Sequence, residues 1–112
     1  MKRVLILEDD AIMAFDLADQ LSMAGFQVVG PAITADEALK LLATEGCDVA
    51  TLDVNLGGGR TSEPVAIELK RRAIPFVVVS GYATEQHSAV FSEAPLVVKP
   101  VRFDRLLKAL GG

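Results

Sequence analysis

The sequence predicts an α/β domain in which a doubly wound, five-stranded parallel sheet lies between two layers of helices. Five short apolar runs lack the polar–apolar alternation of a half-exposed strand, so they suit strands that are buried on both faces. Longer stretches with a helical spacing of apolar residues separate these runs, and such repeats give a three-layer sandwich with right-handed crossovers. The length of 112 residues is that of one domain, which we take to be residues 1–112.

The five predicted strands are short runs rich in Val, Leu and Ile. In chain order they are Val4–Leu7, Phe26–Val29, Val49–Leu52, Phe76–Val79 and Leu96–Val98. The second run ends at Gly30–Pro31 and carries no reactive side chain there, which suits a strand at the far side of the sheet.

The first two helices are predicted from their apolar positions and from their end signals. Asp10 is expected to cap the first helix, and Gly25 is expected to end it. The broad apolar face expected to pack on the sheet contains Ile12, Phe15, Leu17, Ala18, Leu21 and Met23. Thr34 is the expected N-cap of the second helix, with Glu37 three residues later as in a capping box, and this helix runs to Gly46.

The other three helices differ in how strongly the sequence indicates them. The third is centred on residues 65–69 and is broken before Pro75. The fourth, over residues 84–91, is polar, and we expect it to be short or mobile. The last covers residues 104–110 and adds Phe103 to its apolar face.

The composition excludes several classes of protein. The chain has 11 Lys and Arg against 15 Asp and Glu, a net charge of −4, which argues against nucleic-acid binding because that needs a basic patch. No apolar run approaches the roughly 20 residues that span a bilayer. Acidic residues Glu8, Asp9 and Asp10 cut short the apolar N-terminus, so no signal peptide is expected. One cysteine cannot form an internal disulfide. We therefore expect a soluble cytoplasmic protein that binds neither nucleic acid nor membrane.

Four of the five predicted strands run directly into a reactive polar residue. The first ends at Glu8 and Asp9, the third at Asp53, the fourth at Ser80 and the fifth at Lys99. The carboxyl ends of parallel strands lie at one edge of the sheet, where ligands of open α/β folds bind. Two carboxylates about 4 Å apart repel by roughly 4 kcal/mol at an effective dielectric constant near 20. Such a cluster either raises a pKa or binds a cation, and oxygen ligands suit Mg²⁺.

These residue types match the chemistry of a phosphoryl acceptor. An aspartate such as Asp53 is an accepted nucleophile for forming an aspartyl phosphate. Lys99 can neutralise a phosphoryl oxygen, and the hydroxyl of Ser80 can donate to the same place. The metal and the lysine would stabilise charge in the transition state.

The same residues lie in four motifs that resemble those of the response-regulator receiver domain, the CheY-like module of two-component signalling. The motifs are Leu5–Asp9, Asp48–Leu56, Val79–Gly81 and Val97–Pro100, in the family's order, and the resemblance covers essentially the whole chain. The resemblance implies the flavodoxin-like strand order 2-1-3-4-5.

The resemblance also implies a role for each residue around the acceptor. Asp53 would receive the phosphoryl group from a sensor histidine kinase or a phosphotransfer protein. The side chains of Asp9 and Asp53 and the backbone carbonyl of Asn55 would hold Mg²⁺, with Glu8 bound directly or through water. The protein would not be an enzyme beyond catalysing its own phosphorylation and dephosphorylation.

On the other side of the acceptor, the resemblance implies that Lys99 contacts the phosphoryl group and that Ser80 turns inward to hydrogen-bond it. The bond between Lys99 and Pro100 matches the family's cis site. The chain departs from the family at Leu96, where an aromatic residue is common, while Tyr82 offers an aromatic group two residues after Ser80. Phosphorylation would shift the domain to a conformation that docks a downstream protein through residues 84–110, and a homodimer is left open.

Three alternatives are left open. A degenerate pseudo-receiver would only bind partners, but such a site usually loses one of its reactive residues. An Asp-dependent phosphatase usually has a second aspartate two residues after the first, where this chain has Asn55. A flavin module would need a phosphate-binding loop where Glu8 and Asp9 stand. Gly57–Gly59 lacks the Lys-Ser or Lys-Thr of a P-loop, so a flexible loop near the site is expected there.

Overall fold

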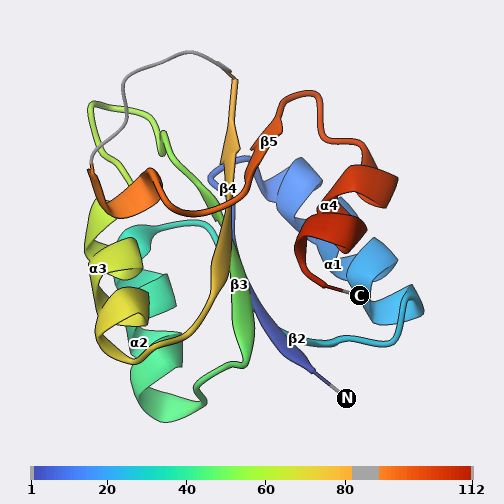
Figure 1. The fold of residues 1–112 in the computed structure, drawn as a ribbon, viewed down its shortest axis with the longest axis horizontal. Coiled ribbons are helices and arrows are strands. Elements are labelled where there is room, and N and C mark those ends of the chain that lie inside the picture. The colour runs from blue at the N-terminus through green and yellow to red at the C-terminus, as the bar shows by residue number, and fades with distance from the viewer. Residues whose placement is uncertain (1, 82–88, 112) are drawn as a thin grey trace.

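The computed structural model describes residues 2–81 and 89–111. Five parallel strands form one sheet in the order β2-β1-β3-β4-β5, which confirms the expected fold class and strand order. Helices α1 and α4 cover one face of the sheet, and α2, α3 and the short 3₁₀ helix η1 cover the other (Figure 1). The elements are β1 (Arg3–Leu7), α1 (Ala11–Met23), β2 (Gln27–Ala32), α2 (Ala35–Thr44), β3 (Val49–Asp53), α3 (Glu63–Arg71), β4 (Phe76–Ser80), η1 (Ala89–Phe91), β5 (Leu96–Val98) and α4 (Phe103–Ala109).

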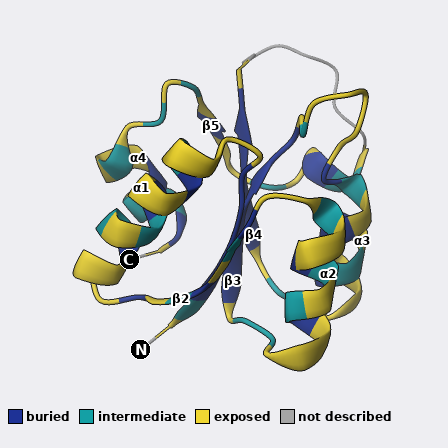
Figure 2. Ribbon diagram, turned by 180° about the vertical axis from the view of Figure 1, so that it is seen from behind, coloured by how far each residue is buried: buried dark blue, intermediate teal, exposed yellow. Residues whose placement is uncertain are grey.

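The centre of the sheet is buried and its edges are not. Every residue of β3 and β4 is buried, whereas β2 and β5 contain exposed as well as buried positions (Figure 2). The central strands have helices on both faces, which explains why their sequences are continuous apolar runs. Within the described residues, no helix combines the length and the apolar character needed to cross a bilayer.

The second strand is longer than the sequence indicated. It continues past Val29 through Gly30 and Pro31 to Ala32, and its pairing with β1 shifts register on the way. Gly30 has a φ of +97°, and a Cβ on it would lie 2.7 Å from the backbone nitrogen of Ala32. Only glycine fits this irregularity, so the dipeptide that marked the predicted end of the strand is a bulge within it.

The first helix begins as expected but buries a narrower face. The side chain of Asp10 accepts hydrogen bonds from the first turn of α1, which confirms the N-cap. The buried residues of α1 are Ala14, Leu17 and Leu21. Ile12, Phe15 and Met23 are 83%, 61% and 89% exposed, so the predicted apolar face was wrong for them. Successive helical residues are rotated by about 100°, and these three lie beyond the stripe that meets the sheet.

The other helices agree with the sequence more closely. The backbone N–H of Glu37 donates to Thr34 Oγ1 at 3.1 Å, which confirms Thr34 as the N-cap of α2. The Glu37 carboxylate accepts from the Thr34 hydroxyl at 3.4 Å, rather than from the backbone N–H of a full capping box. The predicted helix over residues 84–91 falls largely outside the described residues, as does Tyr82, and its last three residues form η1.

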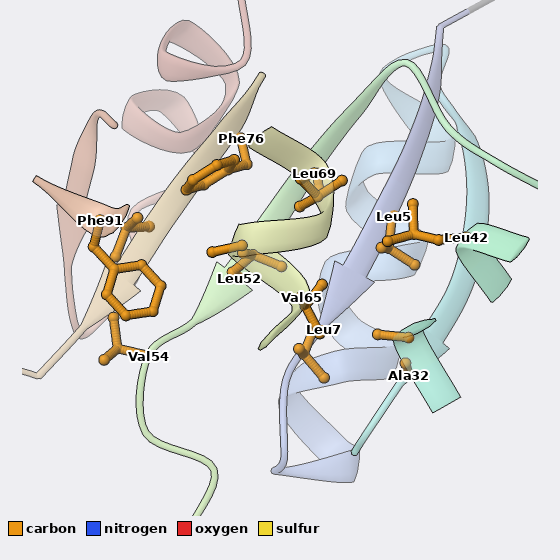
Figure 3. Packing of buried hydrophobic residues seen from close by; sticks show 14 of the residues in the cluster. Leu5, Leu7, Ala32, Leu42, Leu52, Val54, Val65, Leu69, Phe76 and Phe91 are labelled. Atoms are coloured by element: carbon orange, nitrogen blue, oxygen red, sulfur yellow. The ribbon is translucent and has the colours of Figure 1, made fainter. Parts of the chain in front are cut away.

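Two apolar clusters hold the layers together, one on each face of the sheet. Figure 3 shows the first of them, in which Leu5, Leu52 and Phe76 of the strands meet Leu42 of α2 and Leu69 of α3. A fully buried leucine contributes roughly 1.5–3 kcal/mol relative to an exposed one, so these contacts anchor the strands whose ends carry the polar residues.

Candidate functional site

Strand register brings the predicted site residues to the carboxyl edge of the sheet. Leu7 of β1 pairs with Leu52 of β3, so Glu8 and Asp53 are the next residues on neighbouring strands. Asp53 pairs with Val79 of β4, and the following residue of that strand is Ser80. Lys99 directly follows β5, and its N–H donates to the carbonyl of Ser80 at 2.8 Å.

Three carboxylates form the acidic part of the site. Glu8, Asp9 and Asp53 each offer one oxygen, and these oxygens lie within 4.8 Å of one another. Glu8 is 2% exposed and Asp53 is 4% exposed, whereas Asp9 is exposed. Water therefore screens the repulsion between Glu8 and Asp53 poorly, and the cluster needs either a compensating cation or a bound proton.

Lys99 supplies part of that compensation. Its Nζ donates to Asp53 Oδ2 at 2.9 Å and to Glu8 Oε1 at 3.1 Å. The second oxygen of Glu8 is buried and has no hydrogen-bond partner among the described residues. A hard oxygen ligand set with one buried oxygen left over fits a divalent cation such as Mg²⁺.

The pKa values reflect the same crowding. Burial, followed by the hydrogen bond and the negative charge of Asp53, raises the pKa of Glu8 to about 8, although Lys99 opposes the shift. Burial and the charge of Asp53 also raise the pKa of Asp9. Burial lowers the pKa of Lys99, but its hydrogen bonds to Asp53 and Glu8 outweigh burial and the net shift is upward. Without a cation, the site therefore holds a proton on Glu8 at neutral pH.

The other predicted residues lie around this cluster. Ser80 is completely buried at the end of β4. Asn55 lies two residues past Asp53, with an exposed side chain, in an antiparallel bridge with Thr61. The Lys99–Pro100 peptide bond is cis, as predicted. Leu96, at the position where we noted a missing aromatic residue, is 38% exposed on β5.

The segment after β3 is a hairpin, an element that was not among those predicted from the sequence. The N–H of Leu56 donates to the carbonyl of Arg60, and the N–H of Ser62 donates to the carbonyl of Val54, both at 3.0 Å. Gly57–Gly59 forms the turn between these arms, so the loop expected near the site is the tip of this hairpin. Consecutive glycines between two short arms are a hairpin signal, and this signal was available in the sequence.

A cavity of about 480 Å³ lies between α1 and the segment that follows β5. Met13 and Leu17 of α1 line one wall, and Lys99, Pro100 and Phe103 line the other. Lys99 is the residue that this cavity shares with the acidic cluster, since Glu8, Asp9 and Asp53 do not line it.

Comparison with known proteins identifies the same kind of domain. The family described as response regulator receiver domain matches residues 4–111. The solution structure of SdrG from Sphingomonas melonis Fr1 is 38% identical, with a TM-score of 0.83 and coverage of 99% of this chain and 94% of SdrG. Chemotaxis protein CheY from Thermotoga maritima is 27% identical over 97% of this chain and 94% of its own length.

Other matches are longer proteins. Transcriptional regulatory protein PdtaR from Mycobacterium tuberculosis is 27% identical over 97% of this chain, and this chain spans 55% of PdtaR. Receiver domains are signalling switches of two-component systems and bind Mg²⁺ at an acidic site. The cluster of Glu8, Asp9 and Asp53 fits such a site. From its sequence, its strand order and this acidic edge, the chain belongs to the response regulator receiver domain family.

Proposed function

We propose that residues 1–112 act as one phosphoacceptor switch, in which Asp53 receives a phosphoryl group from a histidine kinase or a phosphotransfer protein. The observation that carries the proposal is the environment of Asp53. Its carboxylate is nearly buried, hydrogen-bonded to Lys99 and close to two further carboxylates. A carboxylate held beside a lysine and a cation site is arranged for phosphoryl transfer.

The reaction follows from the positions of the side chains. An oxygen of Asp53 attacks phosphorus in line with the bond from phosphorus to the donor's histidine nitrogen, which breaks and leaves the electron pair on the imidazole. Bound Mg²⁺, held by Asp9, Asp53 and the Asn55 carbonyl with Glu8 in contact directly or through water, would supply positive charge at the phosphoryl oxygens.

Two other side chains complete the transfer. Lys99 gives up part of its hydrogen bonding to Asp53 and Glu8 and donates instead to the phosphoryl oxygens. This contact stabilises the negative charge that develops on those oxygens. The hydroxyl of Ser80 donates to a phosphoryl oxygen, and its movement starts the conformational change. The chain catalyses only its own phosphorylation and hydrolysis in this scheme.

The partners follow from the surfaces around the acceptor. The phosphodonor must reach Asp53, and Ile12 and Phe15 are exposed on α1, which starts directly after the acidic residues. Helix α1 carries aspartates and no Lys or Arg, so the donor surface that fits it is apolar with basic residues around it. On the far side, Leu96 and Val98 are 38% and 39% exposed on β5.

We propose that this exposed part of β5, together with α4, docks the downstream protein. A phosphoryl group adds a charge of about −1.5 to −2 at Asp53. This charge then shifts the equilibrium between the inactive and the active conformation of the domain. The net charge of −4 argues against a nucleic-acid partner, and we propose a cytoplasmic role without membrane contact. A homodimer is an alternative occupant of the same surface.

Intact mass spectrometry after incubation with Mg²⁺ and acetyl phosphate tests the proposal. The expected result is one phosphoryl adduct that needs Mg²⁺, disappears in Asp53→Asn and persists in Asp36→Asn, a matched change at an exposed carboxylate of α2. Acetyl phosphate could give no adduct even though the chain binds Mg²⁺ and accepts a phosphoryl group from a purified histidine kinase. That result would mean that only a protein donor is accepted. No adduct and no Mg²⁺ binding would instead identify a pseudo-receiver, and continuous release of phosphate from many esters would identify a phosphatase.

A further inference from the structure

We infer that the hairpin of residues 54–62 is the element that shapes the metal side of the acceptor site, with Gly57–Gly59 and Thr61 as its positioning residues. This inference rests on the proposed function, because it concerns the ion that the function requires. It adds a physical reason for a glycine run that no step of phosphoryl transfer uses directly.

Both arms of the hairpin are fixed to the protein core. Val54 is 5% exposed, and its N–H donates to the carbonyl of Val79 at 3.0 Å. Ser62 is completely buried at the other end, where α3 begins. Asn55, whose carbonyl the resemblance assigns to Mg²⁺, directly follows the first of these two anchors.

The hydrogen bonds between the arms hold Asn55 in register. Asn55 faces Thr61 in an antiparallel bridge, and one hydrogen bond flanks the pair on each side. Thr61 Oγ1 also accepts the N–H of Glu63 at 3.3 Å, and Ser62, the N-cap of α3, makes no side-chain cap bond. Thr61 therefore ties the hairpin to the first turn of α3.

The turn of the hairpin requires all three glycines. Gly57, Gly58 and Gly59 have φ values of +78°, +59° and +77°. The N–H of Arg60 donates to the carbonyl of Gly57 at 3.0 Å, so Gly58 and Gly59 are the central residues of a turn with positive φ at both, as in a type I′ turn. Other residues strain in this region, so the glycines allow the arms to close.

The turn also approaches the acidic cluster. A Cβ at Gly57 would lie 3.5 Å from Oδ2 of Asp9, the most exposed of the three carboxylates. The hairpin thus fixes the Asn55 carbonyl at its base and borders Asp9 at its tip. Mg²⁺ demands near-ideal octahedral geometry, so a hairpin that is ordered before the ion arrives lowers the cost of binding.

A pair of matched glycine substitutions tests the inference in the unphosphorylated full chain. Gly59 and Gly46 have φ values of +77° and +71°, and a Cβ on either meets nothing within 4 Å. Gly59→Ala and Gly46→Ala therefore introduce the same backbone strain, once inside the hairpin and once at the end of α2. We expect both to lower the melting temperature similarly, while only Gly59→Ala raises the Mg²⁺ dissociation constant, by about fivefold or more, in isothermal titration calorimetry.

A second pair covers the case in which the glycine variants fold poorly. Thr61→Ser keeps the hydroxyl that accepts from Glu63, and Thr61→Val keeps the branched shape without it. We expect near-normal Mg²⁺ affinity for the serine variant and weaker affinity for the valine variant. Hydrogen exchange of the Leu56, Arg60 and Ser62 amides should be slow in the unmodified chain and faster in Gly59→Ala.

The outcomes separate this inference from the proposed function. Equal Mg²⁺ affinities for Gly59→Ala and Gly46→Ala, or for Thr61→Val and Thr61→Ser, would overturn the inference while Mg²⁺-dependent phosphorylation of Asp53 stood. Absence of Mg²⁺ binding in the unmodified chain would overturn both. Weaker binding confined to the hairpin variants, with faster exchange of the same three amides, would establish the positioning role.

Discussion

The centre of the sheet and its β5 edge contribute to the same site but are built differently. Asp53 ends a strand in which every residue is buried, and Glu8 follows a strand covered on both faces. Lys99 follows a strand of three residues in which Leu96 and Val98 are partly exposed. Glu8 and Asp53 therefore lie in the most deeply buried part of the sheet, and Lys99 follows a lightly packed edge strand. The proposed switch would bind its ion at the buried centre and change its surface at the edge, and this division suits both tasks.

The largest effect should come from damage to the centre. Leu52 is completely buried on β3, next to Asp53. Leu52→Ala should lower the free energy of unfolding by about 3 kcal/mol, because it removes buried methyl groups and leaves a cavity. Chemical denaturation followed by circular dichroism measures this loss. A loss no greater than that of an exposed leucine would contradict the deep burial of the centre.

The next largest effect is expected on the rate of phosphorylation, and it distinguishes the role of Lys99 from that of the carboxylates. Lys99→Met should slow phosphorylation by acetyl phosphate about 100-fold, because a preorganised charge is lost from the transition state. Mg²⁺ affinity should stay equal or become tighter, because the lysine no longer occupies Asp53 and Glu8. Lys70→Met is the control, since Lys70 pairs with exposed Glu93 away from the site. A parallel loss of Mg²⁺ binding would mean that edge and centre do not act separately.

The opposite edge of the sheet offers a third test. Gly30→Ala should destabilise the protein by about 2 kcal/mol, because the bulge of β2 holds this residue in a left-handed conformation against the backbone of Ala32. Gly25→Ala is the comparison, because Gly25 has a similar φ of +100° but open space around it. Equal melting temperatures for the two variants would contradict the close approach at Gly30.

A smaller effect is expected from pH, which should change stability and Mg²⁺ affinity through the protonation of Glu8. The pKa of Glu8 is about 8 in the folded chain against 4.5 ordinarily, so between these values the folded state binds more protons than the unfolded state. Stability without Mg²⁺ should therefore fall as pH rises through this window. Mg²⁺ must displace the proton, so its affinity should tighten by up to about tenfold per pH unit below pH 8.

Calorimetric Mg²⁺ titrations at several pH values check this dependence. Glu8→Gln serves as the control because it cannot release a proton, and its Mg²⁺ affinity should vary much less with pH. Identical pH profiles for the two proteins would assign the proton to a different group.

The smallest effect is expected at the exposed part of β5. Leu96→Ser should change the free energy of unfolding by no more than about 0.5 kcal/mol, because the side chain is already partly in water. Phosphorylation of Asp53 should be unchanged, while binding of the downstream partner should weaken. A large loss of stability would show that β5 is packed as firmly as the centre.

Much of this architecture could be predicted from local sequence patterns. Continuous apolar runs indicated a parallel sheet, and the residues that follow them indicated the acidic edge, because parallel strands align their carboxyl ends. The solvent exposure of Ile12, Phe15 and Met23 could not be predicted from such patterns. A broad apolar helix face does not reveal which stripe meets the sheet, because that depends on how α1 lies across the strands.

The segments around Gly30 and Gly57–Gly59 show a related limit. Glycine next to proline and glycine in a run both predict a break in regular structure. In the folded chain the first is a bulge within β2 and the second is the turn of a hairpin. The bulge depends on pairing with β1, a partner that local propensity does not encode. The glycine run did carry a hairpin signal, but the signal does not say which residues of 54–62 pair across the turn.

The sequence by itself determined the order of strands and helices, the family and the identity of the residues at the sheet edge, because these depend on residue types and their spacing. Only the tertiary structure decided which of those residues form hydrogen bonds and ion pairs with one another and how far each is buried. Lys99 bonds to Asp53 and Glu8, which lie 46 and 91 residues away along the chain. Burial of Glu8, its unpartnered oxygen and its raised pKa arise from that long-range packing, because desolvation is a property of the assembled core and not of any segment within it.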